Sequence, residues 1–204
     1  EFKRKAAPEL VEVIETEAQR LNRFVANLLD MARVEAGALR LHIEATDLTD
    51  SVASAVHDTR RMLENHAIRL EVPPTLPLVR VDAQLFHHCL INLLDNAGRY
   101  ADPETPIIIR AGRTPDGITL SILDEGPGLP PGRESQIFET FTRFEGSDRS
   151  KGGTGLGLAI VKGFVEAMGM RVEATNRGDR QGACFSLHFP NILLMREPSA
   201  EKNP

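Results

Sequence analysis

Cysteine is scarce in this sequence, which has only Cys89 and Cys184 in 204 residues. The two lie far apart within apolar runs, and no Cys-x-x-Cys pair or histidine-rich spacing accompanies them. A disulfide framework and a zinc site of the usual spacing are therefore excluded. We expect two buried free thiols in a protein of a reducing cytosol.

An excess of basic residues is also lacking. The 24 lysines and arginines are outnumbered by 29 aspartates and glutamates, which gives a net charge of -5 and a pI near 5.7. The arginines are scattered along the chain rather than clustered. Nucleic-acid binding is therefore not expected.

Long hydrophobic runs are missing as well. No stretch stays apolar for the ~18 residues that a helix needs to cross a bilayer, and no signal peptide opens the chain. We expect this piece to be soluble. It begins at Glu1 without a methionine, so we expect it to be excised from a longer protein. What is present, 41% hydrophobic and 26% charged residues, is typical of a globular domain.

One long helix is predicted from Pro8 to Gly37. Apolar residues recur along it at coiled-coil-like spacing, while its opposite face carries charged side chains. A helix of this kind needs partner helices along one side. The apolar stripe consists of Ile14, Leu21, Phe24, Leu28 and Met31, with Ala18, Val25 and Ala32 beside them.

The rest of the chain mixes short strands with helices. Strands are predicted over residues 39–43, 68–72, 78–81, 107–113, 118–123, 171–176 and 183–189. Helices are predicted over residues 47–65, 82–100 and 156–168. Asp82 should cap the helix 82–100. The turn Thr114-Pro115-Asp116-Gly117 should connect the strands 107–113 and 118–123 in a hairpin.

This order of elements predicts an α+β fold. We expect a two-layer α/β sandwich over residues 38–190, preceded by the helical appendage of residues 1–37. Beyond Pro190 the chain becomes polar. Residues 191–204 are therefore expected to form a flexible tail.

Two asparagines mark the predicted helix 82–100. Asn92 and Asn96 are four residues apart, so they lie on one face, and Arg99 and Tyr100 follow about one turn further on. Carboxamide oxygens suit a hydrated Mg²⁺ that bridges nucleotide phosphates, because Mg²⁺ keeps several waters. Two surface asparagines on an amphipathic helix would give the same pattern. Gly98 weakens this helix by up to ~1 kcal/mol unless close packing requires it.

An acidic residue ends the predicted strand 118–123. Asp124 is followed by Gly126 and Gly128. Such an acid can accept a hydrogen bond from an exocyclic amine like that of adenine, and the glycines let the backbone approach a ligand. A plain surface turn would carry the same residues.

A second glycine-rich stretch, GGTGLGL at residues 152–158, opens the predicted helix 156–168. Backbone N–H groups at such a helix start suit phosphate. The spacing fits neither the Rossmann nor the P-loop pattern. The polar stretch of residues 145–153 before it is typical of a mobile lid over a nucleotide, although a flexible surface loop is the alternative.

Taken together and in this order, four motifs resemble those of one known family. NLLDNAGRY, DEGPGLP, FETFTRF and GGTGLGLAI are similar to the N, G1, F and G2 boxes of bacterial sensor histidine kinases. The helix sequence LNRFVANLLDMARVEAGAL and the later LPLVRVD are most similar to the KdpD-type, potassium-responsive kinases.

The resemblance implies a Bergerat-type pocket that binds ATP with Mg²⁺. It places Asn92 and Asn96 at magnesium and the phosphates, and Asp124 at the adenine amine. Tyr100 would pack near the base, and Phe138 and Phe141 would anchor the lid. The implied nucleotide-binding residues are Asn92, Asn96, Arg99, Tyr100, Asp124, Gly126, Gly128, Arg143, Gly153, Thr154, Gly155, Leu156 and Gly157.

The resemblance also implies partners. Residues 1–37 would be the second helix of a dimerisation and phosphotransfer hairpin, whose first helix, with the phosphoacceptor histidine, is not in this chain. The parent protein would be a homodimer that passes the phosphoryl group to a response-regulator receiver domain. It would be anchored in a membrane, with this portion in the cytoplasm.

Two other functions compete with the kinase. ATPases of the gyrase, Hsp90 and mismatch-repair type place a glutamate one turn before the magnesium asparagine; here Asn92 stands there, and a carboxamide cannot take a proton from water. A degenerate module that only binds or dimerises would be the other alternative.

The histidines of the chain are not expected to be phosphorylated. His57 begins a segment like a phosphoacceptor box, but the proline of that box is absent and the segment lies inside the predicted sandwich. The other histidines have no acidic neighbour pattern in the sequence and are expected to be structural: His42, His66, His87, His88 and His188.

Overall fold

The computed structural model describes residues 2–140, 142 and 155–195, although not all side chains in the first turns of the long helix. Its helices are α1 (Phe2–Glu35), α2 (Leu48–Thr59), α3 (Ala83–Tyr100) and α4 (Gly157–Ala167), with 3₁₀ turns η1 (Gln136–Phe138) and η2 (Asn191–Leu193). The strands are β1 (Ile43–Thr46), β2 (Ile68–Glu71), β3 (Val79–Asp82), β4 (Ile107–Thr114), β5 (Gly117–Leu123), β6 (Arg171–Asn176) and β7 (Ala183–Pro190).

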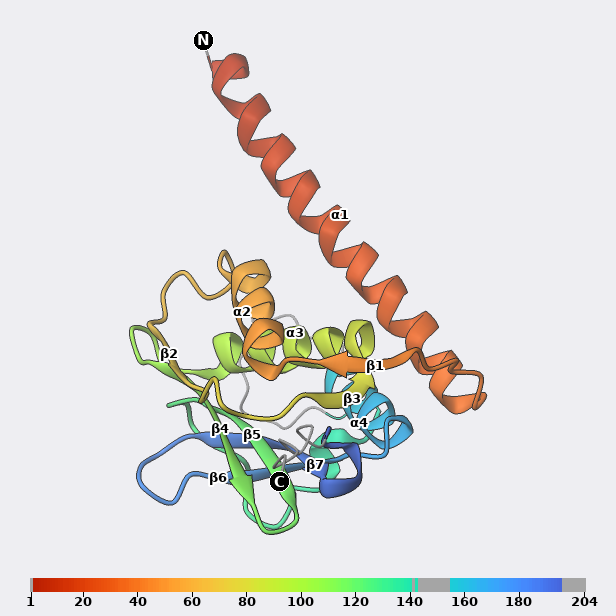
Figure 1. Ribbon diagram of the computed structural model, residues 1–204. Helices are drawn as coiled ribbons and strands as arrows, with labels where there is room; N and C mark the ends of the chain where they lie inside the picture. Colours follow the sequence, from red (N-terminus) through yellow and green to blue (C-terminus); the bar gives the residue numbers. More distant parts are fainter. Residues whose placement is uncertain (1, 141, 143–154, 196–204) are drawn as a thin grey trace, which may run out of the picture.

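Five strands form the main sheet, in the order β2-β4-β5-β7-β6 (Figure 1). Neighbours are antiparallel except β2 and β4, which are parallel. The β4–β5 hairpin turns at the predicted place, because Thr114 pairs with Gly117. A Cβ on Gly117 would lie 1.8 Å from the Phe189 carbonyl oxygen, so only glycine fits. β1 and β3 make a separate two-stranded sheet.

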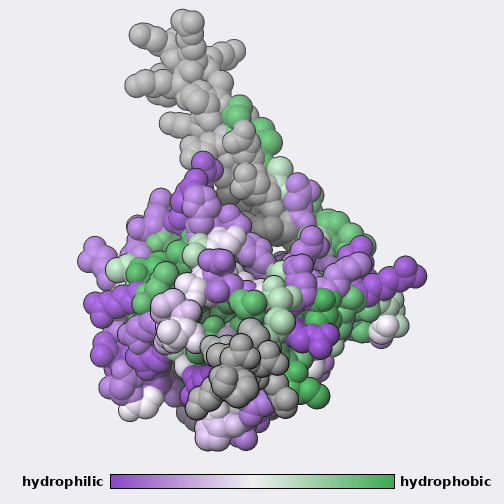
Figure 2. Space-filling view, viewed as in Figure 1, coloured by the Kyte–Doolittle hydropathy of each residue, from purple (hydrophilic) through white to green (hydrophobic). Residues whose placement is uncertain are grey.

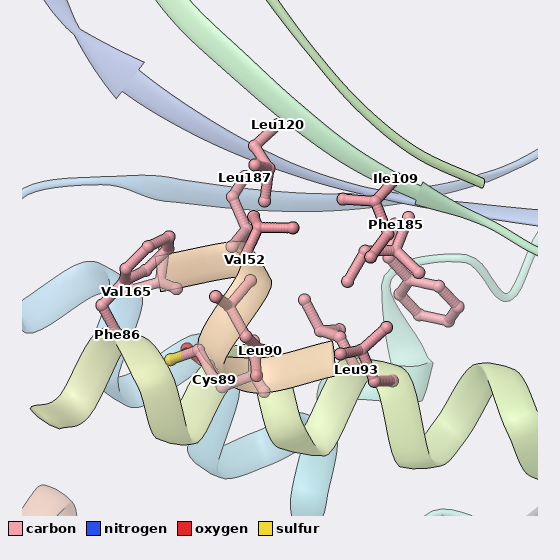
Figure 3. Close-up of a cluster of buried hydrophobic side chains, with 14 of the residues drawn as sticks. Val52, Phe86, Cys89, Leu90, Leu93, Ile109, Leu120, Val165, Phe185 and Leu187 are labelled. Carbon is pink, nitrogen blue, oxygen red and sulfur yellow. The ribbon is translucent and has the colours of Figure 1, made fainter. Parts of the chain in front are cut away.

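Helices α2, α3 and α4 cover one face of this sheet and enclose the core. Along β7 buried and half-buried residues alternate, as expected for a strand with one covered face. Figure 3 shows Leu90 and Leu93 of α3 pointing toward Ile109, Leu120 and Leu187 of the sheet. The predicted two-layer α/β sandwich is thus confirmed.

Helix α1 leaves the sandwich as a long projection (Figure 1). Its last turns pack on the sandwich: a Cβ on Gly163 of α4 would lie 2.5 Å from the Val34 side chain. Asp30 Oδ2 lies 3.3 Å from His88 Nδ1 of α3. Within residues 2–140, 142 and 155–195, no helix has the length and apolarity needed to cross a bilayer.

Several boundaries differ from those predicted, and α1 begins at Phe2 rather than at Pro8. The strand expected over residues 39–43 is wrong, since the strand starts only at Ile43. Leu39 and Leu41 pack against the core from irregular chain, and the backbone N–H of His42 donates to Asp82 Oδ2 at 2.8 Å. The alternation of apolar residues over 39–43 therefore reflects which side chains are buried and does not indicate a strand.

The helix expected to reach residue 65 ends at Thr59. Its last turn tightens because the backbone N–H of Arg60 bonds to His57, three residues back. At the other end of the chain, the part of the expected tail that the structure describes, residues 191–195, is packed. Leu194 bridges to Val79, and the Met195 N–H donates to the Leu78 carbonyl at 2.8 Å. Apolar residues after Pro190 thus extend the core.

Two expectations about single residues were also tested. Gly98 lies in a closely packed place, because a Cβ there would lie 2.5 Å from Leu63 Cδ2 and the leucine would have to shift. Three histidines do contact carboxylates, in each case on another element: His87 with Asp58, His88 with Asp30 and His188 with Glu173. The sequence spacing missed these pairs because the partners are distant in the chain.

Candidate functional site

Helix α3 carries both asparagines and is well defined at its start. Asp82 caps it as predicted, accepting hydrogen bonds from the N–H groups of Gln84 and Leu85 at 3.1 and 3.0 Å. The apolar face of α3 is fully buried under the sheet. Asn92 and Asn96 are half-buried on another part of its surface.

Asn92 meets the glycine-rich entry of α4. Its amide nitrogen donates to the His88 carbonyl at 3.0 Å, which fixes the side chain against its own helix. The oxygen Oδ1 points toward α4, since a Cβ on Gly157 would lie only 2.9 Å from it. The absence of a side chain at residue 157 therefore lets the start of α4 pack closely against Asn92.

The start of α4 has the form expected of a phosphate site. Gly155 has a φ of 71°, which glycine adopts readily, and Leu156 is fully buried. Leu156 stands at the N-cap position and its side chain makes no capping hydrogen bond. The first backbone N–H groups of α4 and the positive end of its dipole therefore suit an anion.

Asp124 follows β5 and is 2% exposed. Its Oδ1 accepts hydrogen bonds from the N–H groups of Gly126 at 3.0 Å and Ala183 at 3.1 Å. Burial raises the pKa of the carboxyl group, and the two backbone hydrogen bonds and the charge of Arg177 oppose that rise. Neither hydrogen bond uses Oδ2. The side chain is thus a fixed, buried acceptor.

The loop after Asp124 lies against the end of α3. A Cβ on Gly126 would be 2.2 Å from the Tyr100 carbonyl oxygen, and the Asp102 N–H donates to the Glu125 carbonyl at 3.1 Å. The fold therefore joins motifs that are far apart in sequence: the asparagine helix touches both the Asp124 loop and the entry of α4.

Gly128 is held by β6. It has a φ of 80°, and a Cβ there would lie 2.5 Å from Asn176 Oδ1. The Asn176 amide bonds both the N–H and the carbonyl of Leu129, at 2.6 and 2.9 Å. Sequence reasoning missed Asn176, which looked like the end of a strand.

Other predicted site residues have a less direct place. Arg99 Nε donates to Asp95 Oδ2 at 2.9 Å, so part of its guanidinium is engaged in an ion pair within α3. Phe138 is buried in η1, consistent with an anchoring role. Arg143, Gly153, Thr154 and Phe141 lie outside the described residues.

The donor set near Asn92 suits a weakly held, hydrated cation. Among the described residues, no group of three or more His, Cys, Asp or Glu side chains could hold a metal by itself. The carboxamide oxygens of Asn92 and Asn96 do suit Mg²⁺ brought in with phosphates, because Mg²⁺ keeps several waters and needs few protein ligands.

A charged cluster behind Asp124 was also missed. Arg177, Asp179 and Arg180 lie between β6 and β7, and Arg177 donates to the Asp124 carbonyl at 3.2 Å. Arg180 donates to Glu125 Oε1 at 2.8 Å. The run of charges in a short turn was the available signal, but its target is distant in the chain.

Comparison with known proteins agrees with this geometry. Residues 81–192 match the family described as histidine kinase-, DNA gyrase B-, and HSP90-like ATPase. Over 171 residues the chain is 42% identical to the sensor protein KdpD of Escherichia coli K12, covering 82% of this chain and 18% of KdpD. The chain thus spans less than a fifth of that relative's length.

Solved structures give the same result. The mycobacterial sensor histidine kinase MprB superposes with a TM-score of 0.64 at 28% identity, over 73% of this chain and 97% of that one. Full-length ShkA, in complex with AMPPNP, superposes with a TM-score of 0.72 at 27% identity, over 84% of this chain and 36% of that one. The chain belongs to the histidine kinase-, DNA gyrase B- and HSP90-like ATPase family and, within it, to the catalytic domains of sensor histidine kinases.

Proposed function

We propose that this chain binds Mg-ATP and, in its parent protein, presents the γ-phosphate to a histidine on a helix absent from the chain. The parent would then pass the phosphoryl group to an aspartate of a response-regulator receiver domain. One observation carries the proposal: α3 joins the three motifs, since Asn92 midway along it meets the entry of α4 at Gly157, and the loop after the buried Asp124 packs on its C-terminal residue Tyr100.

Base recognition would rest on Asp124. Its carboxylate accepts two backbone hydrogen bonds through Oδ1, and Oδ2 would accept one from the exocyclic amine of adenine. Tyr100 would lie near the base, because the Gly126 backbone packs directly on its carbonyl. Gly126 and Gly128 would let the backbone come close to the ring.

Phosphate recognition would rest on α4 and α3. The backbone N–H groups at the start of α4, with Gly153, Thr154, Gly155, Leu156 and Gly157, would bind the phosphates. Asn92 and Asn96 would hold Mg²⁺ through their oxygens, and Arg99 and Arg143 would lie near the phosphates. When bound, Mg²⁺ would neutralise charge on the phosphate oxygens.

The transfer itself needs little from this chain beyond positioning. An imidazole nitrogen would bond to the γ-phosphorus as the bond to the β-phosphate oxygen breaks, so that ADP leaves with that electron pair. The imidazole proton would pass to solvent. Asn92 cannot accept a proton from water, which disfavours a hydrolytic ATPase.

The partners follow from α1. Its exposed apolar residues would pair with the missing hairpin helix and, in a homodimer, with the hairpin of a second subunit. We further propose that the parent protein is anchored in a membrane with this portion in the cytoplasm. That the relatives are sensor proteins of which this chain spans a small part supports this proposal.

Radiolabelled ATP tests the proposal. The chain should bind ATP more tightly with Mg²⁺ than with EDTA, and it should neither label itself nor release phosphate at an appreciable rate. Label should appear on a separately prepared hairpin of a relative that carries the acceptor histidine. Asn96→Ala should lose the Mg²⁺-dependent part of binding, while Asn22→Ala on the exposed surface of α1 should not.

Each rival function gives a different result. Acid-labile label on the chain alone would reinstate His57 as an acceptor. Rapid phosphate release that depends on Mg²⁺ would favour the ATPase. No nucleotide binding would leave a degenerate binding or dimerisation module.

A further inference from the structure

The Arg177 side chain is buried although it carries a full charge. It is 2% exposed and lies in the turn between β6 and β7. Its Nε and Nη2 donate to the two carboxylate oxygens of Asp179, at 3.0 and 2.8 Å, in the bidentate arrangement that arginine favours. Its Nη1 reaches the other way and donates to the Asp124 carbonyl at 3.2 Å.

Besides the hydrogen bond from Gly126, Asp124 is held by Ala183, the first residue of β7, and by Arg177 in the turn before it. Its N–H donates to the Ala183 carbonyl at 3.0 Å, and its Oδ1 accepts from the Ala183 N–H at 3.1 Å. The Arg177 guanidinium takes the main-chain carbonyl. Gly182 leaves the room for this, since a Cβ there would lie 2.0 Å from the Asp124 carbonyl oxygen and 3.0 Å from Arg177 Cδ.

The cluster around Arg177 is charge-balanced. Arg180 Nε donates to Asp179 Oδ2 at 3.1 Å, and its Nη1 donates to Glu125 Oε1 at 2.8 Å. Arg180 and Asp179 are half-exposed or more, so their pair contributes little on its own. The pair orients the Asp179 carboxylate, which in turn holds the Arg177 guanidinium in place. Arg180 itself makes no contact with Asp124 among those seen in the described residues.

We infer that Arg177 is a positioning residue for nucleotide-base recognition, which holds the main chain of Asp124 so that its carboxylate stays aimed at the exocyclic amine of adenine. The inference rests on the proposed ATP site. A lysine would keep the charge but could not span Asp179 and the Asp124 carbonyl together. The shape of the guanidinium, not its charge alone, is therefore required.

The charges acting on Asp124 define a pH signature. Burial raises its pKa, and Arg177 lowers it; Asp102, just after α3, acts weakly in the raising direction, and Glu125 is next in the chain. Without Arg177 the pKa of Asp124 rises further. The carboxyl group would then protonate at a higher pH and become a donor that the amine cannot use.

The experiment compares ATP with inosine triphosphate, which has an oxygen in place of the amine. Affinities of the full 204-residue chain for both would be measured by calorimetry at several values between pH 6 and pH 7.5, and their ratio taken at each pH. The ratio cancels the titration of the phosphates. Arg177→Met should reduce the preference for ATP by about tenfold, with a loss that grows as pH falls.

Two further variants separate the possible causes. Arg177→Lys should recover the pH profile but only part of the preference. Arg180→Gln, which loses contacts within the same cluster, should keep the preference within about twofold, since exposed pairs contribute little. If Arg177→Met does not fold, Arg177→Lys decides, because it keeps the buried stem and the charge.

The outcomes distinguish this inference from the function on which it rests. If the unmodified chain binds neither nucleotide, the proposed ATP site is wrong and the inference falls with it. If the unmodified chain prefers ATP and the Arg177 variants keep the same ratio and pH profile, Arg177 does not position Asp124. An equal loss for both nucleotides would show a structural role only and would overturn the inference.

Discussion

Helices α1 and α3 use their apolar residues in opposite ways. On α3, Phe86, Leu93 and their neighbours are buried beneath the sheet. On α1, Ile14 is 58% exposed and Leu21 61% exposed. We call the exposed apolar residues of this helix the α1 stripe, which consists of Val11, Ile14, Leu21, Phe24, Val25, Leu28 and Leu29. Figure 2 shows hydrophobic side chains on the surface of the described part of α1.

The difference favours the boundary that we expect at residue 37. A helix that is apolar on one side needs a cover, and within the described residues the stripe has none. Among the side chains that the structure describes, α1 meets the sandwich in its last turns, where Asp30 lies near His88 and Val34 packs on Gly163. We call these contacts between the last turns of α1 and the sandwich the α1 joint. The boundary at residue 37 separates the two sides of this joint, and the α1 stripe lies outside it.

The largest expected effect separates two phenylalanines. Phe86 is fully buried and meets Phe189 edge to face with ring centroids 5.5 Å apart. Phe86→Ala should lower the free energy of unfolding by ~3–5 kcal/mol. Phe24→Ala, the same change in the α1 stripe, should cost less than ~1 kcal/mol. Denaturant titration of both variants checks this, and equal losses would show that α1 is part of the core.

A smaller effect tests the α1 joint itself. Gly163→Ala should lower the free energy of unfolding by ~1–3 kcal/mol, because the new Cβ would press on Val34. In a Val34→Ala background the clash is relieved, and the same change should be neutral or stabilising by up to ~1 kcal/mol through helix propensity. A double-mutant cycle measures this reversal. The same sign in both backgrounds would mean that α1 does not pack on α4 in solution.

Low pH should also weaken the packing of α1 on the sandwich. Burial lowers the pKa of His88 below that of the unfolded chain, with Asp30 opposing and His87 reinforcing the shift. The unfolded chain then binds more protons, so stability is lost as the pH falls below ~6.5. His88→Gln should flatten this slope in denaturant titrations from pH 7.5 to 5.5, and Asp30→Asn should steepen it.

The sign of the pH dependence distinguishes His88 from Asp124. Asp124 has a raised pKa, so the folded chain binds more protons and acid acts on it in the stabilising direction. A slope of the opposite sign in the unmodified chain would mean that Asp124 dominates. An unchanged slope in His88→Gln would show that the histidine does not titrate with folding.

How much the sequence predicts depends on how local the cause is. The Asp82 cap and the β4–β5 turn depend on residues a few positions apart, and both were predicted correctly. Gly98 was expected to weaken α3 unless close packing required it, and the sequence could not show that Leu63 packs against it. The strand at residues 39–43 was wrong because alternation reports burial, and burial does not require a ladder.

For the site, types of residue were easier to predict than contacts. The spacing of Asn92 and Asn96 and the position of Asp124 after a strand could be read directly. That Asn92 meets Gly157, or that Arg177 bonds the carbonyl of Asp124, depends on how distant segments close on each other. No periodicity records such contacts, so the cluster around Arg177 looked like a turn.

The smallest expected effect on stability is also the most direct test of the difference between α1 and α3. Leu21→Gln with Leu28→Gln should change the free energy of unfolding by less than ~0.5 kcal/mol, because both side chains are already about half exposed. The same change should abolish self-association of the chain through the α1 stripe, since an exposed apolar stripe favours contact with another one. Sedimentation velocity over a range of concentrations measures the second effect, and denaturant titration the first. A loss of stability without a change in association would mean that the stripe packs on its own chain, and α1 and α3 would then no longer differ in kind.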